Sequence, residues 1–319
     1  MPLLGCFLAD ADLAHLWVCC RALRSYVLPV LVPRVACVHE RLTVDSDWWP
    51  FVRILTDFRL GGRLNLGMLP AVAQLGFGDA FNQPLLMGVL PSTLTQLSFG
   101  HDFNQPLLMG VLPSTLTQLS FGHDFNQLLG SGVLPAGLTH ISFGYFFNQP
   151  LLMAVLPATL THLSFGFAFN RPLVLPAGLT QLSFGEFFNQ PLLMGVLPPT
   201  LTQLSFGHAF NQPLVPGVLP SALIQLSFGD WFNQPLRAGV LPATITQLSF
   251  GYAFDQPLEV GILPAGLTRL SFGEWFNQPL LAGVLPATIT QLSFGYAFNQ
   301  PLLVGALPAG PWPHTPEVW

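Results

Sequence analysis

The sequence predicts a β-solenoid of eleven units, each about 22 residues long, with one short strand in every coil. Three observations support this fold class. A Phe-Asn pair, replaced once by Phe254-Asp255, recurs eleven times at a spacing of 22 residues, except for one step of 19. Each unit carries a Leu-Thr-Gln-Leu-Ser-Phe segment in which apolar and polar residues alternate, as in a strand. A typical unit also contains two prolines and two glycines, which exclude a pair of helices.

The last complete copy shows how each part of the unit is expected to fold. Leu292 and Phe294 point to one side of the expected strand, and Gln291 and Ser293 point to the other. Gly295 ends the strand, because a residue without a Cβ relaxes the restrictions that a turn places on the backbone. The prolines that follow fix φ at about −65° and keep the rest of the unit out of a helix.

The composition follows from the repeat and excludes several classes of protein. The chain has 319 residues, ten Arg, no Lys, fifteen acids and a net charge of −5, and only 8% of its residues are charged, where roughly 25% is usual. Twenty-two of its 28 Phe belong to the repeat. A chain so rich in aromatic residues is not disordered. Because it has no run of about 20 apolar residues, we expect no membrane contact. Because it has no Lys and a negative net charge, we expect no nucleic-acid partner.

The most uniform polar residue of the repeat is the Asn that follows the second Phe. Stacked copies of this side chain can donate to and accept from the backbone of the next coil, so we expect them to form a structural ladder. Asp255 keeps the acceptors and loses the amide donors, which predicts a weak rung. The ladder residues are Asn82, Asn104, Asn126, Asn148, Asn170, Asn189, Asn211, Asn233, Asn277 and Asn299.

The unit resembles the FNIP repeat, a relative of leucine-rich repeats. The tetrapeptide Phe-Asn-Gln-Pro stands unchanged in eight copies, as at 81–84, with variants at Phe125, Phe169 and Phe254. The resemblance covers Leu69 to Pro308. It implies a curved, leucine-rich-repeat-like β-solenoid that binds other proteins and has no catalytic activity of its own.

The ends of the chain differ from the repeats. Residues 1–45 are expected to form a small α-helical segment, residues 46–68 a linker and N-terminal cap, residues 69–308 the eleven repeats, and residues 309–319 a C-terminal cap. Pro311 and Pro313 in the last segment are expected to stop a further strand and so protect the sheet edge. All four cysteines lie in the first 37 residues, with neither zinc nor disulfide spacing, which favours free thiols in a reducing cytosol.

The helical segment resembles the middle of an F-box, the domain through which substrate receptors of ubiquitin ligases bind a Skp-type adaptor. Leu8, Leu13, Leu16 and Val18 are the residues that this resemblance assigns to the adaptor contact. The Leu-Pro-x-Glu start that is typical of an F-box is missing. The alternative is an amphipathic cap that only covers the first coil.

The two positions after the strand-ending glycine vary most between copies, and they are the candidate partner-binding surface. Aromatic residues are enriched there, as they are in protein interfaces. The alternative is that these rings pack on the neighbouring coil. The outward Ser and Gln of the strands are expected to be a solvated stripe. The candidate residues are Tyr145, Phe146, Phe167, Phe187, His208, Trp231, Tyr252, Trp275 and Tyr296.

The sequence offers little catalytic chemistry. No phosphate-binding loop, nucleophile with a supporting base, or opposed pair of carboxylates is recognisable, so we expect no enzyme activity, no cofactor and no small-molecule substrate. His101-Asp102 and His123-Asp124 would stack on adjacent coils and offer zinc ligands. A stack directs such ligands poorly, so we expect no metal site.

These observations leave three functions open. The first is a substrate-receptor subunit of a ubiquitin ligase, in which the helical segment binds a Skp-type adaptor and the solenoid selects a protein target. The second is a non-enzymatic interaction scaffold whose helices only cap the repeats. The third is a self-associating structural protein. The expected location is the cytoplasm, with the nucleus as the alternative.

Overall fold

A computed structural model describes residues 34–35, 54–58, 64, 69, 71–302, 305–307 and 317–318, of which only the backbone is described at 34–35, 54–58 and 317–318. Its strands form one fourteen-stranded sheet in which spatial order equals chain order. All neighbouring strands are parallel. The strands are β1 (Arg34–Val35), β2 (Ile54–Phe58), β3 (Gln74–Phe77), β4 (Gln96–Ser98), β5 (Gln118–Ser120), β6 (His140–Ser142), β7 (His162–Ser164), β8 (Gln181–Ser183), β9 (Gln203–Ser205), β10 (Gln225–Ser227), β11 (Gln247–Ser249), β12 (Arg269–Ser271), β13 (Gln291–Phe294) and β14 (Glu317–Val318).

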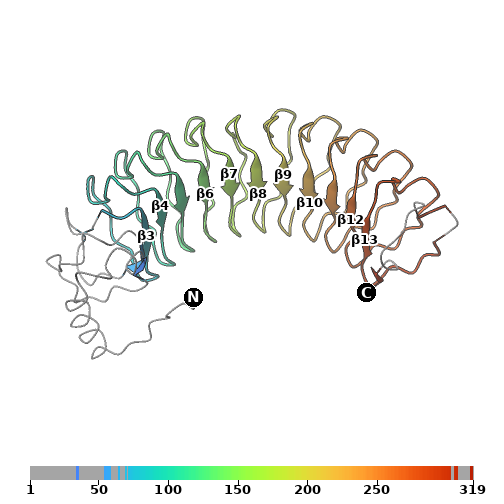
Figure 1. Cartoon of the computed structure of the whole chain (residues 1–319), viewed down its shortest axis with the longest axis horizontal. Coiled ribbons are helices and arrows are strands. Elements are labelled where there is room, and N and C mark those ends of the chain that lie inside the picture. The colour runs from blue at the N-terminus through green and yellow to red at the C-terminus, as the bar shows by residue number, and fades with distance from the viewer. Residues whose placement is uncertain are drawn as a thin grey trace, which may run out of the picture.

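The coils follow one another along an arch, with β3 and β13 near its two ends (Figure 1). Each repeat contributes one strand, and equivalent residues pair across the sheet, as Gln225, Leu226 and Ser227 do with the next coil. Identical units stack in this way because each coil satisfies its backbone groups only on a neighbour of the same shape. The predicted fold class, a curved β-solenoid with one short strand per coil, is confirmed. Among the described residues, no helix is long and apolar enough to cross a membrane.

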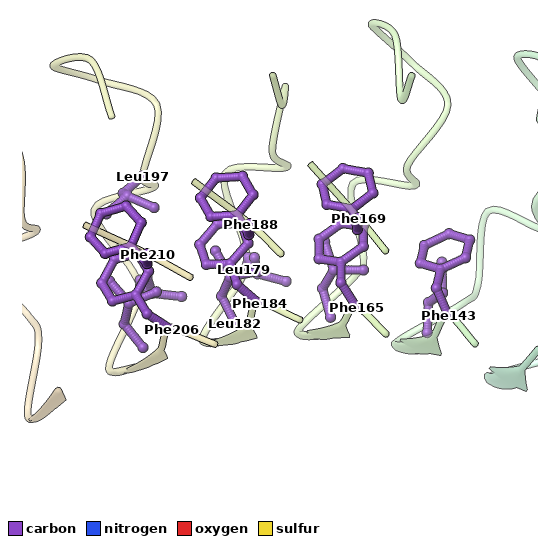
Figure 2. Close-up of a cluster of buried hydrophobic side chains, with 14 of the residues drawn as sticks. Phe143, Phe165, Phe169, Leu179, Leu182, Phe184, Phe188, Leu197, Phe206 and Phe210 are labelled. Atoms are coloured by element: carbon purple, nitrogen blue, oxygen red, sulfur yellow. The ribbon is translucent and has the colours of Figure 1, made fainter. Parts of the chain in front are cut away.

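The core consists of two columns of stacked phenylalanines, of which Figure 2 shows a part. Within a coil the two rings lie nearly face to face, with centroids 3.7 Å apart for Phe184 and Phe188. Between coils the rings repeat at 5.6 Å from Phe184 to Phe206 and at 6.2 Å from Phe188 to Phe210. The second phenylalanine is fully buried in most coils. These stacks supply the apolar burial that a 22-residue unit cannot achieve alone.

The strand-ending glycine is required for a reason other than the one we predicted. At Gly122 an added Cβ would overlap the carbonyl oxygen of Gly100 in the preceding coil. The same overlap occurs at the equivalent glycines from Gly100 to Gly295, and none of them has a positive φ. Glycine is therefore needed because adjacent backbones approach closely at the end of the strand, not because the turn needs an unusual φ.

A second glycine of the unit does need the left-handed region. Nine glycines, from Gly88 to Gly305, have φ between 78° and 87°, and each stands two residues before the Leu-Pro that opens the next coil. Ala154 occupies the same turn at φ 62°, the only positive φ of a described residue other than glycine. A side chain with a Cβ is strained in this region, so the coil of Ala154 carries a local strain that its neighbours lack.

The predicted Asn ladder is present, and its geometry shows which atom supports it. The backbone N–H of Asn126 donates to Oδ1 of Asn104 at 3.0 Å, and Nε2 of Gln127 donates to the same oxygen at 2.9 Å. Asp255 occupies its rung in the same way, because its Oδ1 accepts from the backbone of Asn277 at 2.9 Å and from the next glutamine at 3.0 Å. Asp255 therefore keeps the acceptor role of the ladder, as expected, and its weakness as a rung through the lost amide donors stays a prediction.

The sheet extends beyond the repeats at both ends. β2 pairs with β3, and β1 pairs with β2. At the other end β14 pairs with β13 through Ser293↔Glu317 and Phe294↔Val318, so Pro311 and Pro313 do not end the sheet as expected. Each proline removes a backbone N–H donor only at its own position. The two residues of β14, which follow the prolines, still have theirs and form this short pairing. Of the expected helical segment, residues 1–45, the structure describes Arg34–Val35, which form strand β1 and not a helix because they pair with β2; the remainder lies outside the described residues.

Candidate binding surface

A groove runs along the solvent-facing side of the sheet, and we call it the sheet groove. Its volume is about 1190 Å³, and residues from every strand between β3 and β13 line it. The strands present their Gln and Ser side chains to this side because the intervening Leu is buried, as at β8, where Gln181 and Ser183 flank the buried Leu182. The stripe that we predicted to be merely solvated is thus the floor of a concave surface that extends over eleven strands.

The side chains that alternate with leucine along the floor of the sheet groove are polar and nearly all uncharged. Among its described lining residues, Arg269 is the one permanently charged side chain, and His140 and His162 are the titratable ones. The remaining polar side chains are Gln amides, Ser hydroxyls and one Thr hydroxyl, which both donate and accept hydrogen bonds. A surface of this kind can pair with the backbone and polar side chains of a protein segment without selecting for its charge.

The two groove histidines stack with ring centroids 4.0 Å apart. The single hydroxyl hydrogen of Thr139 is donated to the carbonyl oxygen of Thr117, so its 2.8 Å contact with Nδ1 of His140 requires an N–H on the ring. The same argument holds for Thr161 and His162. Nδ1 of each ring therefore carries a hydrogen and donates to the neighbouring threonine hydroxyl. Burial, and then the charge of His140, lower the pKa of His162 below its ordinary value.

The aromatic residues after the strand-ending glycine form a ridge of stacked rings, which we call the aromatic edge. His123 and Tyr145 stack at 4.6 Å, and Tyr145 and Phe167 stack at 4.3 Å. Phe146 meets the rings of His123 and Tyr145 edge-on. The rings thus pack on neighbouring coils, as the structural alternative predicted.

A second group of rings lies further along the aromatic edge. Trp231 meets the ring of His208 edge-on and donates its indole N–H to Nε2 of that histidine. Trp275 meets Tyr252 at 5.1 Å and Trp231 at 6.5 Å, across a coil that carries the small, buried Ala253. Packing and exposure coexist at these positions, because each tryptophan still has about half of its surface in solvent.

The structure places the predicted partner-binding residues at a surface, and whether they bind a partner stays a prediction. Tyr296 is 83% exposed, and Phe167 and His208 are half-buried. The others are between 37% and 51% exposed, namely Tyr145, Phe146, Phe187, Trp231, Tyr252 and Trp275. The predicted adaptor-binding residues Leu8, Leu13, Leu16 and Val18 lie outside the described residues.

A row of exposed apolar side chains, which we call the Leu-Met ridge, was not predicted from the sequence. Four coils place a Leu-Met pair on the turn that ends at the positive-φ residue, and these side chains are between 61% and 78% exposed. Methionine before the turn glycine was the available signal, because a flexible apolar residue kept at a turn is unusual for a solvated loop. The pairs are Leu86-Met87, Leu108-Met109, Leu152-Met153 and Leu193-Met194.

The histidines and carboxylates of two adjacent coils also come together. Nδ1 of His101 lies 2.8 Å from Oδ1 of Asp102, and Nδ1 of His123 lies 2.6 Å from Oδ1 of Asp124. The hydrogen bond to Asp102 raises the pKa of His101 above its ordinary value, and the charges of Asp124, Asp102 and Asp79 act in the same direction. Three potential ligand atoms of His101, His123 and Asp124 lie within 4.8 Å of one another.

Comparison with solved structures finds a similar protein of known structure. The crystal structure of CroV588, a novel circular LRR protein, shares 45% sequence identity with this chain and superposes with a TM-score of 0.76. The alignment covers 79% of this chain and 37% of that protein, so the chain spans little more than a third of the neighbour's length. A leucine-rich repeat protein from Bacteroides ovatus matches over 83% of this chain and 78% of its own, at 12% identity and a TM-score of 0.21.

The comparison with curated proteins gives no match. The family model described as FNIP Repeat matches residues 67–102, 81–124, 125–168, 169–209, 210–253, 232–275, 254–297 and 276–310. These matches cover well over half of the chain and coincide with the coils of the solenoid. The chain therefore belongs to the FNIP repeat family.

Proposed function

We propose that this chain is a non-enzymatic interaction protein that binds a protein segment along the sheet groove, with the aromatic edge as part of the contact. The observation that carries the proposal is the groove itself, a continuous concavity lined by one strand from every coil, of which seven strands read Gln-Leu-Ser. Its uncharged donors and acceptors suit a polypeptide better than an ion or a phosphate. Half-exposed tyrosine and tryptophan side chains supply the anchors that such interfaces use.

A photo-crosslinking experiment tests where the partner lies. A crosslinking amino acid is placed at Gln203 in the sheet groove and, as the matched control, at Leu152 on the Leu-Met ridge. Both side chains face solvent, so neither substitution should alter the fold. The proposal predicts a crosslinked protein partner from the groove position and none from the ridge position. The reverse pattern would refute a groove-bound partner.

The finer proposal is that the chain is a substrate receptor of a ubiquitin ligase in the cytoplasm. It rests on the F-box-like pattern of residues 8–24, which would bind a Skp-type adaptor while the solenoid selects the target. Co-precipitation with a Skp-type adaptor tests it, and Leu13→Asp with Leu16→Asp should abolish the complex. If the double variant instead unfolds the solenoid, the segment is a cap and the receptor role is wrong.

The Leu-Met ridge favours self-association as a second candidate function. An exposed row of apolar side chains spread over several coils is a recurrent mark of an association surface. Met109→Gln with Met153→Gln makes the ridge polar without touching the sheet groove. Sedimentation should show concentration-dependent oligomers for the wild type and monomers for this variant. Monomers of the wild type at all concentrations would exclude this function.

A further inference from the structure

Two adjacent coils carry a charged cluster at one end of the aromatic edge, and its charges have no part in the proposed function. His101-Asp102 and His123-Asp124 occupy the two variable positions of consecutive coils, and Asp79 precedes them in the coil before. Three of the nine acids that follow residue 65 therefore lie in this small region of a chain with few charges elsewhere. Such a concentration of carboxylates attracts a cation.

The geometry brings nitrogen and oxygen ligands to one place. The two imidazole rings stack with centroids 4.2 Å apart and an interplanar angle of 12°. Nδ1 of His123 lies 2.6 Å from Oδ1 of Asp124, and Nδ1 of His101 lies 4.0 Å from the same oxygen. Asp102 adds a further oxygen 2.8 Å from Nδ1 of His101.

The carboxylates lie close enough to the ring nitrogens to share one ion with them. Each Nδ1 lies within hydrogen-bond distance of the carboxylate of the following residue, so each ring nitrogen already has an oxygen ligand beside it. In a tetrahedral zinc site, ligand atoms at about 2.1 Å from the metal are separated by about 3.4 Å. The three closest ligand atoms lie within 4.8 Å of one another, so their separations must shrink by up to about 1.4 Å, and the side chains that carry them are 34% to 51% exposed.

We propose that His101, His123 and Asp124, with Asp102 as the fourth ligand, bind a zinc-like divalent transition metal ion. Imidazole nitrogen with carboxylate oxygen is a donor set that suits zinc, whereas calcium and magnesium prefer oxygen alone. The ion would take the place of the hydrogens now shared between the rings and the carboxylates. It would also connect two coils, because its ligands come from successive repeats.

The chain supplies its own substitutions for testing this site. His123→Tyr installs the residue that the next coil carries as Tyr145, and Asp124→Ala installs the residue found at Ala168. Both therefore remove a ligand and keep a side chain that the repeat already accommodates. The matched control is His140→Gln with His162→Gln. These rings also stack, at 4.0 Å, but their Nδ1 atoms contact threonine hydroxyls, and most coils carry Gln at that position.

Titration of the full chain with ZnCl₂, followed by calorimetry, measures the number of ions bound. We expect His123→Tyr and Asp124→Ala each to bind one ion fewer per chain than the wild type, or to weaken that ion at least tenfold. The His140/His162 control should match the wild type. Unchanged stoichiometry and affinity in the two ligand variants, or loss of the ion in the control alone, would overturn the proposal.

Co²⁺ separates this site from the four cysteines before residue 38, which can also bind metal. A thiolate site shows an intense sulfur-to-cobalt charge-transfer band in the near ultraviolet, and a nitrogen–oxygen site does not. The Co²⁺-loaded His123→Tyr variant should therefore show weaker visible ligand-field absorption than the wild type, because it has lost one ion. Any charge-transfer band should be the same in both proteins. Loss of the charge-transfer band in this variant would place the ion on sulfur and contradict the assignment.

Discussion

The backbone amide of Asn126 donates to Oδ1 of Asn104 at 3.0 Å, and the equivalent contact joins every pair of adjacent coils from Asn82 to Asn299. One side-chain oxygen per coil thus satisfies the bend of the next coil. We expect Asn104→Ala to lower the free energy of unfolding by about 1–3 kcal/mol, because it leaves a partly buried N–H without its acceptor. Asn104→Asp keeps the oxygen, as Asp255 does, and should cost much less in urea denaturation. Equal losses for both variants would contradict this account of the ladder.

The strain at Ala154 gives a stabilising prediction. Ala154→Gly should raise the free energy of unfolding by about 1 kcal/mol, because glycine adopts a positive φ without the clash of a Cβ. Gly132→Ala, at the same turn of the preceding coil, should lower it by a similar amount. Thermal melting of the two variants beside the wild type measures both shifts. A lower melting temperature for Ala154→Gly would show that this turn is not strained.

The close approach of Gly122 and Gly100 predicts a severe effect from a single methyl group. Gly122→Ala should destabilise the solenoid by at least about 3 kcal/mol, because the new Cβ overlaps a backbone carbonyl that cannot move alone. Gly137 provides the control, since an added Cβ there would lie 3.4 Å from its nearest neighbour, the carbonyl oxygen of Ser114, and other coils carry Thr at this position. Gly137→Ala should melt close to the wild type, and similar melting of both variants would refute the argument.

Much of the fold could be predicted from the sequence because identical units must stack in identical register. The strand at Gln-Leu-Ser, the Phe columns and the Asn ladder all follow from a 22-residue spacing. The importance of Gly122 for packing could not be predicted, because it depends on the distance between two backbones in successive coils. β14 was missed because its pairing depends on how the chain returns after Pro313, which no local pattern specifies.

The candidate binding surface was harder to predict from the sequence than the fold. The residues of the aromatic edge were predicted from their variability, and their ring-to-ring packing was left as an alternative, since exposure depends on the neighbouring coil. The sheet groove was not predicted, because a repeated Gln and Ser pattern does not indicate whether the sheet is concave. The concavity arises only when many coils are stacked. The Leu-Met ridge was hidden because Leu107 and Leu108 look alike in sequence, whereas the first is buried and the second is exposed.

His162 makes stability depend on pH. Burial and His140 on β6 lower the pKa of His162, and β8 places the uncharged Gln181 beside it. The folded chain therefore binds fewer protons than the unfolded chain, so this contribution is present above pH 6.5 and is lost as the pH falls below it. His162→Gln should flatten the melting temperature between about pH 5 and 7 relative to the wild type. An unchanged pH profile would show that His162 is not the group responsible.

The most direct test of the proposed function uses the protein partner that crosslinking at Gln203 identifies. Its affinity is measured for the wild type and for a variant in which the sheet groove is filled. Gln181→Arg with Gln203→Arg fills the middle of the sheet groove with long charged side chains, and Arg269 at the equivalent position shows that a strand accepts this change. The account predicts at least a tenfold loss of affinity with an unchanged melting temperature. Affinity equal to that of the wild type would place the partner elsewhere and contradict the groove as the binding surface.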